Sequence, residues 1–298
     1  MDSPRIGICI LNFHQPKLTL DCLDSLAKQT YRHFKVFLID NDTEGEFDKP
    51  QLTQYSFLHY HSESTNTGFA GGNNIAIKQA LKAGCDYIIL LNNDTHVAPD
   101  FLKTFIHHAS HQSATDILGC NIVYLKQPDK IWFAGGRLYQ PFLLTQHFLM
   151  NQPIQKTHHL PKLRQTDWLT GCTMGMKQEF FRQVGFFDET FFAYLEDVDL
   201  CLRAKLRGGK CLIINQPLVK HAVSPAIGIS GSNKFTDKKL SLQITNSIRL
   251  LRKHGNDYIN IKIIGNILCQ AIIYLIQHRI GLYQIRLITH TIKDRHPL

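Results

Sequence analysis

Short apolar runs alternate with amphipathic stretches over residues 1–120, and this alternation restricts the possible folds more than any other feature of the sequence. Strand–helix alternation of this kind predicts an α/β fold with a doubly wound, mostly parallel sheet. In such sheets ligands bind beyond the carboxyl ends of the strands. Residue periodicity predicts strands at 6–13, 35–39, 57–60 and 87–91, and helices at 18–28, 72–83 and from 99 towards 111.

Polar residues occur where predicted strands end. Asn12 closes the first strand, Asp40 follows the second, and Asn92 to Asp94 follow the fourth. Because the carboxyl ends of parallel strands meet at one edge of a sheet, we expect these side chains near a common ligand. The Asp40 carboxylate can accept a hydrogen bond from a pyrimidine N–H or a ribose hydroxyl. The alternative is a turn former, since D-N-D-T is good turn chemistry.

The segment Asn66 to Ala76, N-T-G-F-A-G-G-N-N-I-A, places glycines directly before a predicted helix. Gly68, Gly71 and Gly72 allow the backbone to approach a ligand closely, and the first N–H groups of the helix can face a phosphate. The segment matches neither G-x-G-x-x-G nor a Walker A loop, which argues against a dinucleotide or ATP site. The alternative is a glycine turn with an asparagine cap.

Asp94 follows a buried apolar run and is a candidate metal ligand. One carboxylate and two phosphates make a normal site for Mg²⁺ or Mn²⁺, because these ions keep waters and take ligands from the substrate. His221 ends an extended segment and is a candidate ligand of the metal or contact of a diphosphate. The alternative for His221 is a structural role, since the chain has 16 histidines and most must be structural or exposed.

The segment Phe187 to Arg203, F-D-E-T-F-F-A-Y-L-E-D-V-D-L-C-L-R, combines five acids with aromatic residues. Glu196 and Asp199 share one face of a predicted helix, and Asp197 points in another direction, given ~100° per residue. Acids in a first turn also favour the helix dipole, which is the structural alternative. Burial among apolar side chains and like charges raises the pKa of a carboxyl towards the range of a general base. The segment is therefore a candidate for acid–base chemistry.

Charge and cysteine usage limit the partners and the compartment. The net charge of +9 suits nucleic acid, an anionic membrane or a polyphosphate substrate. The sequence has no basic stripe interleaved with aromatic residues, so we expect no nucleic-acid partner. Its eight cysteines form no C-x-x-C pair and its start has no long apolar region, so we expect reduced thiols and a cytoplasmic protein.

The sequence from Lys239 onward has a helical pattern, with a strongly apolar stretch at 259–276. Its longest uncharged run, 263–277, is shorter than the ~20 residues that usually span a bilayer. Three interpretations stay open. The stretch packs on the core or on a second subunit in a homodimer, or it lies on the inner face of the cell membrane as a peripheral helix, or it spans the membrane.

Taken together and in this order, the motifs resemble those of the family 2 glycosyltransferases, and within them the rhamnosyltransferase-like members that build bacterial surface polysaccharides. The motifs are L-N-F, I-D-N-D, N-T-G-F-A-G-G-N-N, L-L-N-N-D-T and the acidic segment, within residues 5–221. The resemblance implies a GT-A fold, a nucleoside-diphosphate sugar donor, a divalent metal and inversion at the anomeric carbon. We predict a GT-A domain at 1–238, with a nucleotide-sugar half at 1–120 and an acceptor-side half at 121–238, then a helical extension at 239–298.

The resemblance also implies roles for single residues. Asp197 matches the acid that acts as base, Asp94 matches the metal-binding acid of a D-x-D-like element, and His221 matches a histidine that helps to hold the metal and diphosphate. Asn92 departs from the pattern, because it stands where that element has its first acid. Predicted substrate-binding residues are Asp40 at the donor base, Asn66, Gly68, Gly71 and Asn74 near the nucleotide, Trp168 and Gly171 on the acceptor side, and Asn12 and Glu196 without a narrower role.

The sequence therefore predicts an enzyme that moves a sugar from dTDP-rhamnose or a UDP-sugar to a hydroxyl of a glycan or lipid-linked acceptor, in surface polysaccharide synthesis. A nucleotidyltransferase is one alternative, but it would normally carry a Lys/Arg-rich phosphate loop where this chain has I-L-N-F-H-Q-P. A non-catalytic relative that only binds nucleotide sugars is the other, and intact Asp94, Asp197 and His221 argue against it. Many relatives have an Arg-Asn pair in the helix after His221, whereas here Asn246 follows Thr245.

Overall fold

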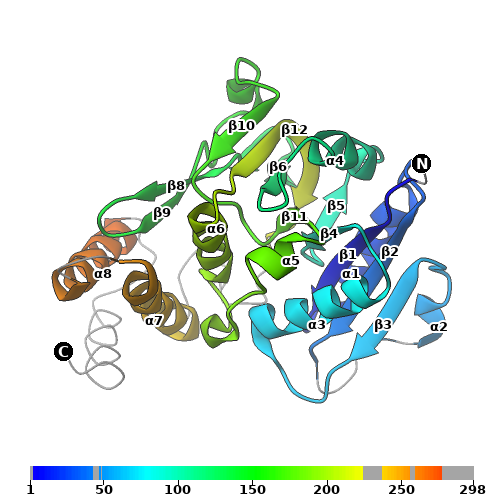
Figure 1. Ribbon diagram of the computed structural model, residues 1–298, viewed down its shortest axis with the longest axis horizontal. Helices are drawn as coiled ribbons and strands as arrows, with labels where there is room; N and C mark the ends of the chain where they lie inside the picture. Colours follow the sequence, from blue (N-terminus) through cyan, green and yellow to red (C-terminus); the bar gives the residue numbers. More distant parts are fainter. Residues whose placement is uncertain (1–2, 43–46, 48, 224–236, 256–258, 277–298) are drawn as a thin grey trace. The chain divides into compact units, whose positions relative to one another are not determined.

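The computed structural model describes residues 3–42, 47, 49–223, 237–255 and 259–276 (Figure 1). Contacts between residues divide the chain into two compact units that interleave along the sequence. The domain boundaries given above therefore stay predictions. The first unit comprises Met1–Arg137, His147–Phe192 and Glu196–Val223, and the second comprises Leu138–Gln146, Ala193–Leu195 and Ser224–Leu298.

A ten-stranded mixed sheet forms the centre of the first unit, in the order β10-β12-β6-β11-β4-β1-β2-β3, with β5 on β12 and β7 on β6. Strands β3, β2, β1 and β4 are parallel neighbours, β12 is parallel to β6, and β11 runs antiparallel between β4 and β6. The predicted α/β fold with a mostly parallel sheet is confirmed. The strands are β1 (Ile6–Asn12), β2 (Phe34–Asp40), β3 (Leu58–Ser62), β4 (Tyr87–Leu91), β5 (Thr95–Val97), β6 (Ile117–Tyr124), β7 (Ile131–Phe133), β10 (Leu163–Thr166), β11 (Thr173–Lys177) and β12 (Cys211–His221), and a separate pair is β8 (Gly136–Tyr139) with β9 (Leu144–His147).

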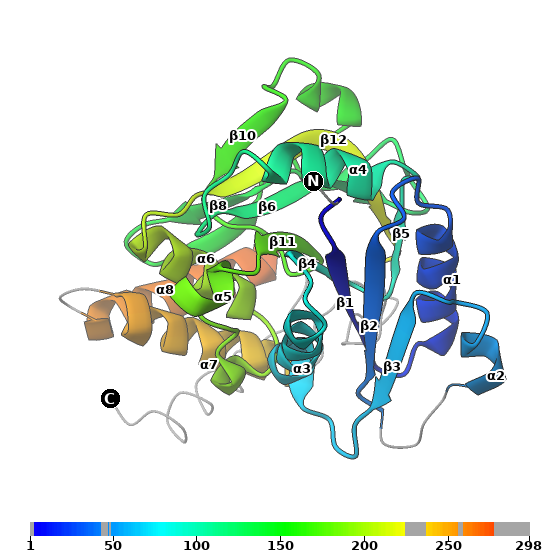
Figure 2. The same cartoon turned by 45° about the vertical axis from the view of Figure 1, so that its right-hand side comes forward.

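Helices cover both faces of this sheet, and α1 and α3 lie on opposite sides of β1 and β2 (Figure 2). Because both faces are covered, the central strands are mainly apolar, and all five residues of β4 are apolar and buried. The polar residues Asn12 of β1 and Asp40 of β2 come at the carboxyl ends of their strands. The helices of the first unit are α1 (Pro16–Ala27), α2 (Lys49–Leu52), α3 (Gly68–Lys82), α4 (Phe101–Ala109), α5 (Phe180–Gln183) and α6 (Glu196–Leu206), with 3₁₀ turns η1 (Ile154–Thr157) and η2 (Glu189–Phe191).

Two elements differ from the sequence prediction. Helix α3 begins at Gly68 and not at Gly72, so the glycine segment is the first turn of the helix. Residue order predicts a strand at 210–215 and a separate extended piece at 219–221. The structure has one continuous strand, β12, over Cys211–His221, because irregular pairing around Pro217 lets it continue along β6. Strand β6 was not predicted at all.

The second unit contains α7 (Asp237–His254) and α8 (Ile259–Ile276), which pack against each other. Gln270 of α8 donates a 2.7 Å hydrogen bond to Ser247 of α7. Ile264, Leu268 and Ile272 are exposed on one face of α8. No helix in the described part of the chain is long and apolar enough to cross a membrane. The predictions of a dimer contact and of a peripheral membrane contact both stay open.

Candidate functional site

The polar residues at the strand ends of the first unit form a hydrogen-bonded network. Asn12 and Asp40 are register partners of β1 and β2, and Asn12 Nδ2 donates to Asp40 Oδ1 at 2.9 Å. The hydroxyl of Tyr60 donates to the other oxygen of Asp40 at 3.0 Å, and its pKa is raised by burial and then by this carboxylate. Asn12 Oδ1 accepts from Thr19 at 2.8 Å and from Asn93 at 3.3 Å. The network thus joins β1, β2, α1 and the turn after β4.

Asn41 holds the glycine turn that starts α3. Its Oδ1 accepts from the backbone N–H of Thr67 at 3.0 Å, and its Nδ2 donates to Asn66 Oδ1 at 3.0 Å and Gly68 O at 3.2 Å. Gly68 has φ +74°, and a Cβ there would lie 2.5 Å from the ring of Phe192. Only glycine therefore fits, because any other residue would be strained at this backbone conformation and its Cβ would clash with the Phe192 ring. The turn contacts the acidic segment directly.

Asn74 belongs to the same helix but bonds to the acidic segment. Its amide donates to Phe187 O at 3.0 Å and Glu189 Oε1 at 2.9 Å, and its carbonyl accepts from the backbone N–H of Phe187 at 3.0 Å. These bonds make Asn74 a positioning residue for the segment, and its contact with a nucleotide stays a prediction. Gly71 is buried in the first turn of α3.

Asp197 lies in the first turn of α6, directly after the buried Glu196. Its Oδ2 accepts from the backbone N–H of Gly171 at 2.9 Å, and its Oδ1 accepts from that of Val198 at 2.8 Å. Burial raises the pKa of Asp197 to about 6, although hydrogen bonds from Gly171 and Val198 act in the opposite direction. The result is an oriented carboxylate that is ionised near neutral pH and still basic.

Asp197 and the turn that carries Asp94 both form hydrogen bonds with the segment Gly171–Cys172. The residue after Gly171, Cys172, accepts from the backbone N–H of Asn92 at 3.0 Å through its carbonyl. Since Gly171 bonds to Asp197, two consecutive residues connect the predicted base to the turn that carries the predicted metal ligand. The structure thereby brings both acids to the carboxyl edge of the sheet.

Asp94 and His221 come together because β5 pairs antiparallel with β12. Thr95 and His221 are register partners, and the carbonyl of Asp94 accepts from the N–H of Ala222 at 2.8 Å. His221 Nε2 lies 3.0 Å from Asp94 Oδ1, and both side chains are buried. The ring of Trp132 packs on His221 with centroids 4.3 Å apart. Neither β5 nor the role of Trp132 was predicted from the sequence.

The Asp94–His221 pair fits a divalent ion. Two ligands at right angles on an octahedral ion with bonds of ~2.1 Å would be ~3 Å apart, and Nε2 and Oδ1 are separated by 3.0 Å. In the described residues no group of three or more His, Cys, Asp or Glu side chains could hold a metal. Phosphate oxygens and waters would therefore have to complete the coordination, as Mg²⁺ and Mn²⁺ commonly require.

Asp199 and Trp168 have mainly structural contacts. Asp199 is fully buried and pairs with Arg203 at 2.8 Å, and Arg203 also donates to the carbonyls of Val184 and Phe186. This pair anchors α6 to the turn before the acidic segment. Trp168 is buried, and its indole N–H donates to Arg137 O at 3.1 Å. An acceptor contact through Trp168 stays a prediction.

Residues 7–198 match the family described as Glycosyl transferase family 2. The match covers more than half of the chain, so the protein belongs to this family, as its motifs predicted. The sequence is 24 % identical over 196 residues to the low-salt glycan biosynthesis hexosyltransferase Agl10 of Haloferax volcanii, covering 61 % of this chain and 59 % of that protein. It is 26 % identical over 225 residues to the N-acetylglucosaminyl-diphospho-decaprenol L-rhamnosyltransferase of Mycobacterium tuberculosis, covering 69 % and 72 %.

The fold is similar to that of solved glycosyltransferases. The crystal structure of GalNAc-T7 with UDP, GalNAc and Mn²⁺ superposes with a TM-score of 0.64 and 16 % identity, over 84 % of this chain and 48 % of that one. At this identity the similarity concerns the fold, which is GT-A as predicted. The chain spans little more than half the length of Agl10 and about half of the GalNAc-T7 chain.

Proposed function

We propose that this protein is an inverting glycosyltransferase that moves a sugar from a nucleoside-diphosphate donor to a hydroxyl of a glycan or lipid-linked acceptor. The observation that carries the proposal is Asp197, a carboxylate held by the Gly171 N–H whose pKa burial raises to about 6. A base for a sugar hydroxyl needs this combination of orientation and basicity. The proposed process is surface polysaccharide synthesis, and the name of Agl10, which gives glycan biosynthesis, supports the coarser statement of glycan synthesis.

The chemistry is one displacement. Asp197 accepts the proton of the acceptor hydroxyl while that oxygen forms a bond to the anomeric carbon. The bond from this carbon to the diphosphate oxygen breaks, and the nucleoside diphosphate leaves with the electron pair. Attack from the side opposite the leaving group inverts the configuration. We assign the donor to the Asp40 and glycine-turn side, where the positive end of the α3 dipole favours negative charge. The N–H groups of Gly68 and Ala70 already donate to Asn66 and Phe192, so the dipole and not these two groups provides this effect.

Asp94 and His221 are the residues that would hold a divalent ion, Mg²⁺ or Mn²⁺, in this proposal. When bound, the ion neutralises charge on the diphosphate and so favours its departure. Asp94 directly precedes β5 and His221 ends β12, so the pairing of these two strands fixes the position of the pair before any substrate arrives. The bound Mn²⁺ of the GalNAc-T7 crystal structure supports a metal in this fold.

The donor is dTDP-rhamnose or a UDP-sugar in this proposal, and the compartment is the cytoplasm or the inner face of the cell membrane. Rhamnosyl transfer is named for the M. tuberculosis relative, and UDP for the GalNAc-T7 structure. All eight cysteines are free thiols, which supports a reducing compartment.

Thermal unfolding with a panel of nucleotide sugars, each with and without Mn²⁺, tests the donor and the metal together. A true donor should raise the unfolding temperature only, or mostly, when Mn²⁺ is present, because binding to the native state stabilises it. Nucleoside triphosphates serve as the comparison for a nucleotidyltransferase. Stabilisation by triphosphates and by no nucleotide sugar would contradict the proposal.

A further inference from the structure

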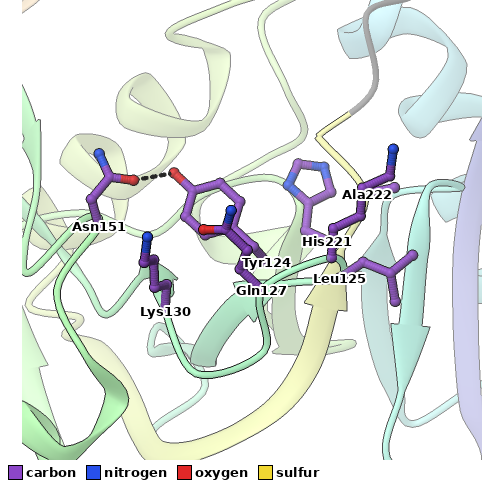
Figure 3. Close-up of a pocket in the computed structure, with 8 residues that line it drawn as sticks. Tyr124, Leu125, Gln127, Lys130, Asn151, His221 and Ala222 are labelled. Atoms are coloured by element: carbon purple, nitrogen blue, oxygen red, sulfur yellow. Dashed lines mark hydrogen bonds between the residues drawn. The ribbon is translucent and has the colours of Figure 1, made fainter.

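A pocket of about 310 Å³ lies at the carboxyl ends of β6 and β12 in the first unit. Tyr124 ends β6, His221 ends β12, and the two are register partners. In Figure 3 Lys130 and Asn151 lie on one side of the Tyr124 ring and His221 on the other, and Tyr124 donates to Asn151 Oδ1 at 2.7 Å. The lining residues are Tyr124, Leu125, Lys126, Gln127, Lys130, Asn151, His221 and Ala222.

The lining of this pocket carries positive charge and no carboxylate. Lys126 and Lys130 are both exposed, and neither forms an ion pair with an acid among the described residues. Asp129 is in the same loop but does not line the pocket. Gln127 and Asn151 add amide groups that can donate hydrogen bonds. Two cations with neutral donors around a concave surface favour a phosphate or diphosphate group.

His221 connects this pocket to the reaction centre. Its ring lines the pocket, and its Nε2 lies 3.0 Å from Asp94 Oδ1. Its Nδ1 is buried and has no hydrogen-bond partner within the described part of the chain. His221 is therefore shared by the pocket and by the pair that is proposed to hold the metal.

The position of the pocket in the sheet separates it from the donor nucleotide. Asp40 ends β2, and from there the sheet runs through β1, β4 and β11 to β6. Asp94 follows β4, so it lies between the proposed nucleotide side and the pocket along the carboxyl edge. A group bound at Lys126 and Lys130 is then on the side of the Asp94–His221 pair that faces away from the proposed nucleotide side.

We propose that this pocket binds a phosphate or diphosphate group of the acceptor, through Lys126 and Lys130. The inference rests on the proposed sugar transfer, and it narrows the acceptor to one that carries its reducing-end sugar on a phosphate. Such an anion would bring the acceptor hydroxyl towards Asp197 from the side opposite the nucleotide. The donor's diphosphate, held at Asp94 and His221, is a separate group.

Tryptophan fluorescence of the full chain provides a test that needs no turnover. The sequence has two tryptophans, and Trp132 packs on His221 at the pocket. The probes are farnesyl diphosphate, farnesol and inorganic phosphate, each titrated with the nucleoside diphosphate of the best donor and Mn²⁺ already at saturation. We expect farnesyl diphosphate to bind, farnesol to bind at least about tenfold more weakly, and inorganic phosphate to compete with farnesyl diphosphate.

The double variant K126Q/K130Q removes both lysine charges of the pocket. The double variant K82Q/K103Q is the control and removes two exposed lysines elsewhere in the same unit. We expect K126Q/K130Q to weaken farnesyl diphosphate binding by about tenfold or more and to leave nucleotide affinity unchanged, with K82Q/K103Q like the wild type. Equal farnesyl diphosphate affinity in all three proteins would overturn the proposal. So would binding of inorganic phosphate to these lysines without binding of farnesyl diphosphate.

Different results would contradict the proposed function and the pocket proposal. If nucleotide sugars do not bind but farnesyl diphosphate still depends on Lys126 and Lys130, the pocket is an anion site and the transferase proposal is wrong. If nucleotide sugars bind and K126Q/K130Q retains full farnesyl diphosphate affinity, the transferase proposal stands and the pocket proposal does not.

Discussion

The backbone N–H of Gly171 donates a 2.9 Å hydrogen bond to Oδ2 of Asp197, which joins the segment before β11 to the start of α6. This bond orients one carboxylate oxygen, and the N–H of Val198 orients the other. Both bonds stabilise the ionised form, yet burial has the larger effect and raises the pKa of Asp197 to about 6. A carboxylate that only caps α6 is favoured when it is ionised, whereas this burial disfavours the ionised form.

Replacing Asp197 with asparagine should lower sugar transfer by about 10²-fold or more, because the base is lost. Nucleotide affinity should stay within about twofold. The variant should also be more stable at pH 8, by about 1–2 kcal/mol, since a partly buried charge is removed. Transfer assays, nucleotide titration and denaturant unfolding measure the three effects. Asp100→Asn, at an exposed position before α4, is the control for charge. Normal transfer by D197N would remove Asp197 from the mechanism.

The pH profile gives a second test of the same group. The pKa of Asp197 is raised to about 6, so the carboxyl is protonated below that pH and cannot accept a proton. We expect kcat/KM to fall tenfold per pH unit below about 6. For stability, the raised pKa means that the contribution of Asp197 is present at low pH and is lost as pH rises through about 6. The stability difference between D197N and wild type should therefore vanish near pH 4 and be largest at pH 8.

Removal of the metal should show whether Asp94 and His221 bind a metal ion or only stabilise the fold. A strong chelator should abolish transfer, and Mn²⁺ should restore it. His221→Ala should weaken Mn²⁺ binding, measured by electron paramagnetic resonance with nucleoside diphosphate present, on the order of tenfold or more. His111→Ala, at an exposed position, is the control. Full activity in the chelator would leave the Asp94–His221 pair as a structural contact.

Substitution of Gly68 tests the packing of the glycine turn on the acidic segment. Gly68→Ala places a Cβ at φ +74° and 2.5 Å from the Phe192 ring, whereas Gly208→Ala has a similar φ of +80° with nothing within 4 Å. Both substitutions introduce backbone strain of about 1 kcal/mol, and only G68A adds a clash. We therefore expect G68A to lower the free energy of unfolding by about 3 kcal/mol or more. Equal losses in denaturant unfolding would mean that Phe192 moves aside freely.

Asn246 has a role inside the second unit that its departure from the Arg-Asn pattern did not indicate. Its Nδ2 donates to the carbonyls of Ala193 at 2.8 Å and Tyr194 at 2.9 Å, and the side chain is buried. Asn246→Asp replaces the donor by an oxygen that faces two carbonyl oxygens, and should cost about 2–3 kcal/mol of stability. Gln243→Glu, whose side chain accepts from Tyr274, is the control on the same helix. A loss no larger than that of the control would contradict this role.

Local pattern was sufficient for the four parallel strands β1 to β4, whereas β5 and β6 were not predicted. The apolar run of β4 and its polar end at Asn92–Asp94 follow from residue order, because a strand buried on both faces must be apolar until it reaches the sheet edge. The glycine turn was placed correctly, but its helix begins at Gly68, since the turn conformation depends on Asn41, which directly follows β2. Strand β5 is only three residues long, and so short an element leaves no periodicity to detect.

The sequence by itself determined the family, the order of the motifs and the candidate acids, since each is a property of neighbouring residues. Only the tertiary structure decided which of these residues meet. Asp94 contacts His221 because β5 pairs with β12. Asn74 donates a hydrogen bond to Glu189 because α3 packs beside the acidic segment. It also decided that Gly171 would become the hydrogen-bond donor that orients Asp197. Such contacts depend on strand order and register, which arise from packing of the whole sheet and not from any local run of residues.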